Sequence, residues 1–335
     1  MDLNIIWFIL VTVLFIGFFF LEGFDYGVGA LIPIVGKTDD EKRVVLNTIG
    51  PFWDGNEVWL ITAGGAIFAA FPHVYATLFS GFYLALFLIL ICLILRACGI
   101  EFRSKQASTS WRNGWDNIIS VTSLLSAVLW GVAVSNLVAG VPIDEKMEFV
   151  GNFFTLLSPF TILGGIVFAL VFLYHGATYL QLKVGEPVVL DRLHALAPKL
   201  GIGMIVATVL WVVYAYFTTG MFDKPVCLAL CAGAAVCMIL SVLFNLKGRH
   251  GIAFIIIALA IALTTVTVFV GLFPNIMIST LNPEWSLNIY NASSSQYTLK
   301  LMTIVAVCLV PVVLAYQAWS FYVFRKRVKK EDVHY

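Results

Sequence analysis

The chain has 335 residues, of which 61% are hydrophobic and only 12% are charged. Soluble domains are roughly 45–50% apolar and about 25% charged, so this composition indicates an integral membrane protein and excludes most soluble enzyme folds. The formal net charge is +1, from 20 Lys and Arg against 19 Asp and Glu. Such a balance offers no attraction to nucleic acid or to any other strongly charged partner.

Long stretches without Asp, Glu, Lys or Arg predict the membrane-spanning helices, because about 20 residues cross a bilayer as a helix. In chain order they are residues 3–21, 58–95, 117–143, 149–182, 200–222, 225–246, 250–283 and 301–324. The 58–95 stretch is long enough for two spans, and Pro72 supplies the turn, since proline cannot continue a helix cleanly. We therefore predict nine transmembrane helices in a single polytopic membrane domain, residues 1–335.

The placement of Lys and Arg predicts the orientation. Seventeen of the twenty follow the first, third, fifth or seventh predicted helix or lie in the tail, and the intervening loops hold only Lys146, Lys224 and Lys300. Because positive residues concentrate in cytoplasmic loops, we expect an extracytoplasmic N-terminus and a cytoplasmic C-terminus. Asp2 and the lack of a small-residue cleavage site predict that the first span is retained. The Asn- and Ser-rich segment 275–297 is then an external loop.

Cysteines and histidines give no sign of a metal site. The six cysteines lie mostly in apolar runs without C-x-x-C spacing, which is typical of inert buried thiols. Among five histidines only His175 lies well inside a predicted span, whereas haem in a membrane usually takes axial His or Met from facing helices. We therefore predict no haem ligand and no metal ligand in this chain, and expect His175 to pack between helices.

Two acids lie near the end of the first predicted helix. Glu22 and Asp25 are three residues apart and share a helix face. Ionisable residues within a membrane are costly, which favours a functional role. The sequence leaves open a second interpretation, in which both carboxylates reach the cytoplasmic interface and are solvated. Gly23 lies between the two acids and Gly27 follows them. These glycines are four residues apart, a spacing that lets another helix approach closely.

Asp54 and Glu57 open the next predicted helix at nearly the same depth. A carboxylate in such a setting can relay protons, so Asp25, Asp54, Glu57 and Glu22 are candidates for a proton pathway from the cytoplasm. The alternative is structural: Asp54 is an N-cap, and Glu57 completes a capping box with it. The two interpretations are compatible with each other.

Several motifs are spread over nearly the whole chain. They are Gly23-Phe-Asp-Tyr-Gly-Val-Gly29, Trp53-Asp-Gly-Asn56, Val58-Trp-Leu-Ile-Thr-Ala-Gly-Gly65, Ser80-Gly-Phe-Tyr83, Gly151-Asn-Phe-Phe154, Gly176-Ala-Thr-Tyr-Leu-Gln181 and a Ser-Ser-Gln run before the last helix. Together they resemble subunit II of the cytochrome bd quinol oxidases of bacteria and archaea. The resemblance implies an all-α integral membrane protein of nine transmembrane helices, built as two four-helix bundles plus one peripheral helix, in a prokaryotic cell membrane.

The resemblance also implies the partner and the cofactors. Subunit II forms a heterodimer with subunit I, which ligates two b-type haems and haem d and holds the quinol site. The complex oxidises quinol, reduces oxygen to water and generates a proton gradient. Subunit II supports assembly of the haem complex and contributes to the access of protons, or of oxygen, to the haems; it is not catalytic alone.

Individual residues match the family's motifs. Asp25 matches an acid of the first helix and Asp54 the acid of the W-D-G-N motif, which the resemblance assigns to proton paths. Trp59 matches a tryptophan associated with oxygen access in some members. Two positions depart from the pattern, because Glu57 and His175 each replace a residue that is often Gln.

Two other functions fit the sequence. A proton-coupled secondary transporter also needs buried carboxylates, near broken helices at mid-membrane. A purely structural subunit would use its acids only to cap helices and to anchor the partner. The sequence does not distinguish ubiquinol from menaquinol, and it leaves open whether a small single-helix subunit joins the complex.

Overall fold

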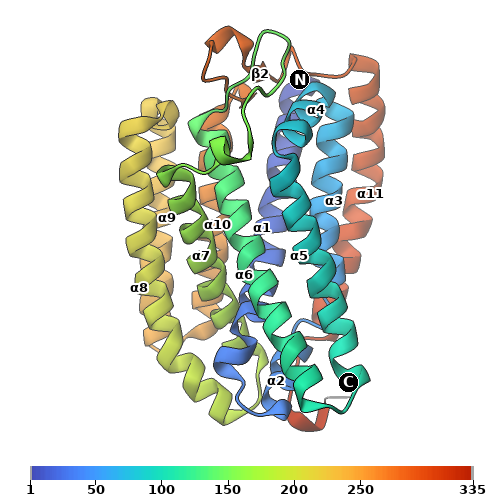
Figure 1. Cartoon of the computed structure of the whole chain (residues 1–335), viewed down its shortest axis with the longest axis vertical. Helices are drawn as coiled ribbons and strands as arrows, with labels where there is room; N and C mark the ends of the chain where they lie inside the picture. The colour runs from blue at the N-terminus through green and yellow to red at the C-terminus, as the bar shows by residue number, and fades with distance from the viewer. Residues whose placement is uncertain (1, 333–335) are drawn as a thin grey trace.

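The structure is a computed structural model that describes residues 2–332 and is almost entirely helical (Figure 1). In this part of the chain the α-helices are α1 (Leu3–Val35), α2 (Asp39–Asn47), α3 (Trp53–Ala70), α4 (Pro72–Gly81), α5 (Tyr83–Phe102), α6 (Thr109–Ala139), α7 (Pro159–Lys183), α8 (Pro187–Thr218), α9 (Pro225–Leu246), α10 (His250–Leu272) and α11 (Gln296–Val323). Short 3-10 turns lie at Arg103–Lys105, Phe153–Leu156, Gly220–Asp223, Pro283–Trp285 and Lys330–Asp332. Strands β1 (Asn275–Met277) and β2 (Leu287–Asn288) pair antiparallel.

The predicted all-α membrane fold is confirmed. Among the described residues, eight helices are long and apolar enough to cross a membrane: α1, α5, α6, α7, α8, α9, α10 and α11. The ninth predicted span is α3, which has 18 residues but is not among the eight, because Asp54 and Glu57 in its first turns lower its hydropathy.

The predicted helix boundaries match the observed ones for α9, but others differ by ten residues or more, as at 149 and 200, where α7 begins at Pro159 and α8 at Pro187. Helix α3 ends at Ala70 and α4 begins at Pro72, so proline makes the turn that the sequence predicts. The rest of that apolar stretch is interrupted a second time at Phe82, between α4 and α5. Helix α1 continues to Val35, well past the predicted end at residue 21, so that Glu22 and Asp25 lie inside the helix and not at its end.

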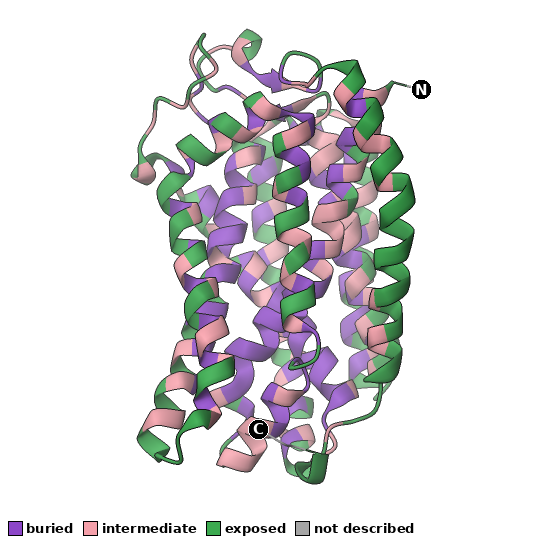
Figure 2. Ribbon diagram, turned by 90° about the vertical axis from the view of Figure 1, so that its right-hand side faces the viewer, coloured by how far each residue is buried: buried purple, intermediate pink, exposed green. Residues whose placement is uncertain are grey.

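Helix α1 runs through the centre of the bundle. It contacts α3, α6, α7 and α10, while α11 lies outside against α1 and α3. Helix α2 and residues 324–332 close one end of the bundle, which we call the α2 end (Figure 1). Helix α4 and the two strands lie at the opposite end, the α4 end. Buried residues are concentrated in the middle of the bundle, and the outer helices turn exposed apolar faces outward, as lipid contact requires (Figure 2).

Glycines allow α1 and α7 to touch backbone to backbone. A Cβ added to Gly27 would lie 1.9 Å from the carbonyl oxygen of Phe172, and one added to Gly176 would lie 2.5 Å from the carbonyl carbon of Gly27. The sequence predicts a close approach at Gly23 and Gly27, and α7 is the helix that makes it. This contact holds the part of α1 that carries Asp25 against α7.

We predict that Gly176→Ala lowers the stability of the purified protein by about 1–3 kcal/mol, because the new methyl group overpacks a backbone contact. Gly203→Ala in α8 is the matched control, since its Cβ would meet Leu170 at an ordinary 3.7 Å. It should leave stability unchanged or raise it slightly, through better helix propensity. Thermal unfolding in detergent measures both variants, and equal melting temperatures would refute the close contact.

Candidate functional site

Arg96 lies at the centre of a buried charged cluster between α1, α3 and α5. Its Nη1 donates hydrogen bonds to Glu22 Oε1 at 2.6 Å and to Glu57 Oε1 at 2.7 Å. The side chains of Arg96 and Glu22 have no exposed surface, and that of Glu57 is 19% exposed. A buried charge is tolerated only when it is paired, so both carboxylates require Arg96, and Arg96 requires at least one of them.

Asp25 is buried on the same face of α1, within the electrostatic reach of Arg96. Its Oδ2 accepts a hydrogen bond of 2.7 Å from Asn56 Nδ2 on α3. The structure therefore brings together three of the four predicted acids, Glu22, Asp25 and Glu57. The interpretation that Glu22 and Asp25 are solvated at the interface is wrong for this chain, because its own helices cover both side chains.

Asp54 differs from the other three acids because it is exposed. The capping box predicted for Asp54 and Glu57 does not form: the N-cap of α3 is Phe52, which makes no side-chain capping bond. Glu57 pairs instead with Arg96. Asp54 thus lies at the surface of the helix whose next turn contributes Glu57 to the buried cluster.

A chain of hydrogen bonds extends from Asp25 to α11. Gln317 Nε2 donates to Asn56 Oδ1 at 3.1 Å, and Trp59 Nε1 donates to Gln317 Oε1 at 2.8 Å. The chain thereby connects Trp59 and Asp25, two residues that the resemblance assigns to different tasks.

His175 is packed between helices, as predicted. Its Nε2 lies 3.0 Å from the carbonyl oxygen of Phe20, and its ring stacks on that of Phe254 with a centroid distance of 4.9 Å. The rings of Phe20 and Phe24 lie 5.7 and 5.8 Å away. Among residues 2–332, no three His, Cys, Asp or Glu side chains gather in a way that could hold a metal ion.

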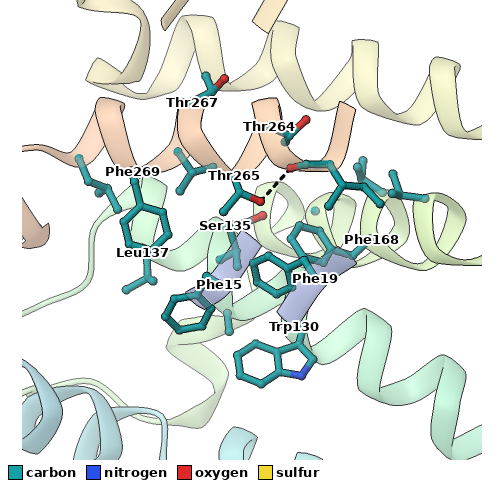
Figure 3. A pocket seen from close by; sticks show the side chains of 18 of the residues that line it. Phe15, Phe19, Trp130, Ser135, Leu137, Phe168, Thr264, Thr265, Thr267 and Phe269 are labelled. Atoms are coloured by element: carbon teal, nitrogen blue, oxygen red, sulfur yellow. Dashed lines mark hydrogen bonds between the residues drawn. The ribbon is translucent and has the colours of Figure 1, made fainter. Parts of the chain in front are cut away.

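A large apolar cavity of about 1070 Å³ lies between the helices, away from the acids (Figure 3). The lining is mainly apolar, with aromatic side chains such as Phe15, Phe19 and Trp130, and it also carries the hydroxyl groups of Ser135, Thr264, Thr265 and Thr267. Thr265 uses its hydroxyl to donate to the carbonyl of Ile261 at 2.9 Å, so it offers little to an occupant. The cavity suits an apolar molecule.

Ion pairs fasten α2 below the acid cluster. Asp39 accepts from Arg103 at 2.8 Å and from Arg112 at 2.6 Å, and Lys42 lies 3.2 Å from Asp116. Partial burial acts to raise the pKa of Asp39, but the hydrogen bond from Arg103 and the neighbouring positive charges outweigh it and hold this pKa below its ordinary value. The α2 end is thus closed by paired charges as well as by the apolar side chains of Val44, Val45 and Leu46, which are buried against the core.

The chain is similar to known membrane proteins over nearly its whole length. Residues 3–324 match the family Cytochrome bd terminal oxidase subunit II. The chain belongs to this family. It is 40% identical over 334 residues to cytochrome bd ubiquinol oxidase subunit 2 of Bacillus subtilis (strain 168), covering 99% of this chain and 98% of that protein. It is 39% identical over 365 residues to cytochrome bd-I ubiquinol oxidase subunit 2 of Escherichia coli (strain K12), covering 99% and 96%.

The fold has a solved counterpart as well. A chain in the structure of bd oxidase from Geobacillus thermodenitrificans superposes with a TM-score of 0.80, at 15% identity, and the match covers 97% of this chain and 99% of that chain. The resemblance inferred from the motifs is confirmed, and the protein is a multi-pass membrane protein of the cytochrome bd subunit II family.

Two residues of this subunit II site are missed by sequence reasoning. Arg96 directly follows the apolar stretch 58–95, so the pattern predicts it among the Lys and Arg residues of the loop after the third helix; it is instead a fully buried residue of α5. Its position along α5 puts it at the same depth as the acids of the other helices, and this is the feature of the sequence that indicates a partner for them. Gln317, the lone amide in the predicted span 301–324, is the second. A polar side chain in an otherwise apolar membrane helix usually has a partner.

Several polar atoms around Arg96 have no hydrogen-bond partner among the described residues. They are Glu22 Oε2, Asp25 Oδ1, Tyr26 Oη, Arg96 Nε and Nη2, and Trp130 Nε1. Tyr26 Oη and Trp130 Nε1 face each other without forming a hydrogen bond of normal geometry. Since buried polar groups are bonded to protein or to ordered water, we expect internal water here.

We predict that X-ray radiolytic labelling of the purified protein modifies Tyr26 and Trp130 at least about threefold more than Tyr174 and Trp211, since the method marks side chains next to bound water. The pairs are matched in exposure, at 1% for Tyr26 and 0% for Tyr174, and 7% for Trp130 and 8% for Trp211. Of these four side chains, only those of Tyr174 and Trp211 have protein hydrogen-bond partners, which are Ser241 and Ser135. Equal labelling within both pairs would mean that the cluster is dry.

Proposed function

We propose that this chain is the haem-free subunit II of a quinol oxidase, and that its buried acids carry protons from the cytoplasm toward haems held by subunit I. Membership of the cytochrome bd subunit II family, over residues 3–324, supports the oxidase assignment. The observation that carries the proton role is the cluster of Glu22, Asp25 and Glu57 around Arg96 in the interior of the bundle.

Among residues 2–332, the histidine that lies deep in a span does not fit a haem. It is His175, and its ring is enclosed by Phe20, Phe24 and Phe254, which leaves no room for a porphyrin beside it. Two b-type haems and haem d therefore belong to subunit I in this proposal, as does the site that binds quinol. When bound there, the haems supply the electron transfer to oxygen, and this chain supplies protons and support for assembly.

The proposed orientation puts the α2 end in the cytoplasm. The Lys- and Arg-rich loops and the tail 325–330 support it, because positive residues concentrate on that side of a membrane. The N-terminus is then extracytoplasmic. Protons taken up from the cytoplasm and quinol protons released outside would together generate a gradient across the cell membrane.

The helix packing supports the proposed arrangement in the membrane. Helix α1 contacts α3 and α6, and α5 contacts α6; in the same way α7, α8, α9 and α10 contact one another in sequence, and α1 and α6 join the two sets through α7. Helix α11 buries only Leu299. With α3 as the ninth span, this corresponds to two four-helix bundles plus one peripheral helix. The α3 surface at Ile61 and Gly65, farther from the α2 end than Asp54, is exposed, and a Cβ on Gly65 would meet nothing. We therefore place the contact with subunit I there and leave Asp54 accessible.

The proposed pathway starts at Asp54, which is accessible, and continues through Glu57 to Glu22 and Asp25. Carboxylates can bind and release protons, whereas Arg96 stays charged and holds their geometry. Internal water at the unpartnered atoms of the cluster would connect the groups. Oxygen access near Trp59 is a further role that the resemblance implies.

A secondary transporter is less well supported. Such proteins bind their ions where helices are broken near mid-membrane. Here Glu22 and Asp25 lie in the unbroken helix α1, and the interruption between α4 and α5 lies toward the other end of the bundle. No observation favours it over the oxidase.

We predict that Asp25→Asn and Asp54→Asn, each in the assembled complex, slow quinol-driven oxygen consumption at least about tenfold while the haem spectrum stays unchanged, because an amide cannot relay protons. Asp144→Asn is the matched control: Asp144 lies in the loop after α6 at the α4 end and accepts only backbone N–H groups in its own turn. It should leave turnover normal. Normal turnover in both test variants would assign these acids to packing alone and leave the structural-subunit interpretation.

A further inference from the structure

Four side chains from three helices form one continuous hydrogen-bonded chain. It runs from Trp59 on α3 to Gln317 on α11 at 2.8 Å, back to Asn56 on α3 at 3.1 Å, and on to Asp25 of α1 at 2.7 Å. The proton pathway proposed above uses Asp25 but assigns nothing to the other three residues.

The chain has only one self-consistent direction. The indole N–H of Trp59 can donate but not accept, so the side-chain oxygen of Gln317 must face it. The amide nitrogen of Gln317 then faces the oxygen of Asn56, and the amide nitrogen of Asn56 is turned toward Asp25. An ionised carboxylate can accept hydrogen bonds but cannot donate them. The direction of the chain, with Asn56 as the donor, therefore matches the charged form of Asp25.

We propose that Trp59 and Gln317 are positioning residues that keep Asn56 turned as a donor toward Asp25 and so favour the ionised form of that carboxylate. The inference rests on the proposed function, because it concerns the acid that the pathway uses. It gives Trp59 a task distinct from oxygen access.

Both positioning residues are held in place. A Cβ added to Gly17 of α1 would lie 2.1 Å from the Trp59 ring, so the indole lies directly on the α1 backbone at that glycine. Gln317 is partly buried on a helix whose other described residues are mostly exposed to the surroundings. Phe321, one turn further along α11, stacks on Phe52 with a centroid distance of 4.3 Å and fixes this part of α11 against the start of α3.

Other charged and titratable groups also face Asp25. They are Arg96 on α5, Glu22 on α1, Glu57 on α3 and the hydroxyl of Tyr179 on α7. None of them takes part in the amide chain. Changing Trp59 or Gln317 therefore alters the donor to Asp25 and leaves the surrounding charges as they are.

The test uses Trp59→Phe and Gln317→Leu in the assembled oxidase, with haem content checked by its optical spectrum. In Trp59→Phe the side-chain amides of Gln317 and Asn56 can both turn over, and in Gln317→Leu that of Asn56 can. In either variant the side-chain oxygen of Asn56 can then accept a hydrogen bond from protonated Asp25. The infrared C=O band of protonated Asp25, identified by its loss in Asp25→Asn, should then titrate about one pH unit higher, a tenfold change in proton binding. The pH profile of oxygen consumption should move in the same direction, and the apparent KM for oxygen should stay unchanged.

Trp319→Phe is the matched control, because Trp319 is an exposed indole two residues from Gln317, and it should shift neither readout. A band that titrates at the wild-type pH in both test variants would overturn the inference, as would a raised KM for oxygen with no shift of the band. The band shift is independent of turnover. If Asp25→Asn turns over normally and the band still shifts, the positioning role stands and the proton pathway fails.

Discussion

The pairing of one guanidinium with several carboxylates inside the membrane is the constraint on which the rest of this structure depends. Arg96 has no exposed surface, and it bonds carboxylates from two other helices, Glu22 on α1 and Glu57 on α3. Removing Arg96 would leave both carboxylates without a counter-charge in a medium of low dielectric constant. Helices α1, α3 and α5 are therefore tied together at one depth, and that depth determines where Asp25 lies.

The surrounding packing follows from this arrangement. Helix α1 can carry two acids into the middle of the bundle because Gly27 and Gly176 let α7 cover them closely, and because Asn56 supplies a donor to Asp25 from α3. The unpartnered atoms on Arg96 and on its neighbours show that protein groups alone do not complete the cluster. A site that is paired yet incompletely bonded combines stability with room for water, which is what proton movement requires.

Much of this architecture could be predicted from residue patterns. Apolar runs located the helices, Pro72 located a turn, and the acids at a common depth were grouped correctly, apart from Asp54. Arg96 could not be recognised, because a charged residue after an apolar run usually marks the start of a loop. It stays buried in α5 because acids on α1 and α3 pair with it. Asp54 and Glu57 fitted a capping box, but a buried arginine outcompeted the backbone for Glu57. The role of Gln317 depends on contacts between helices far apart in sequence, which no local pattern contains.

The most direct test of the central claim is the stability of the assembled complex carrying Arg96→Gln, alone and together with Glu22→Gln and Glu57→Gln, measured by unfolding in detergent. Breaking a buried ion pair on one side costs about 3–5 kcal/mol, whereas replacing all its charges together is often close to neutral. The account predicts that Arg96→Gln alone is strongly destabilised and that the triple variant recovers most of the loss. Wild-type stability in Arg96→Gln, or a triple variant that is as unstable as the single one, would contradict it.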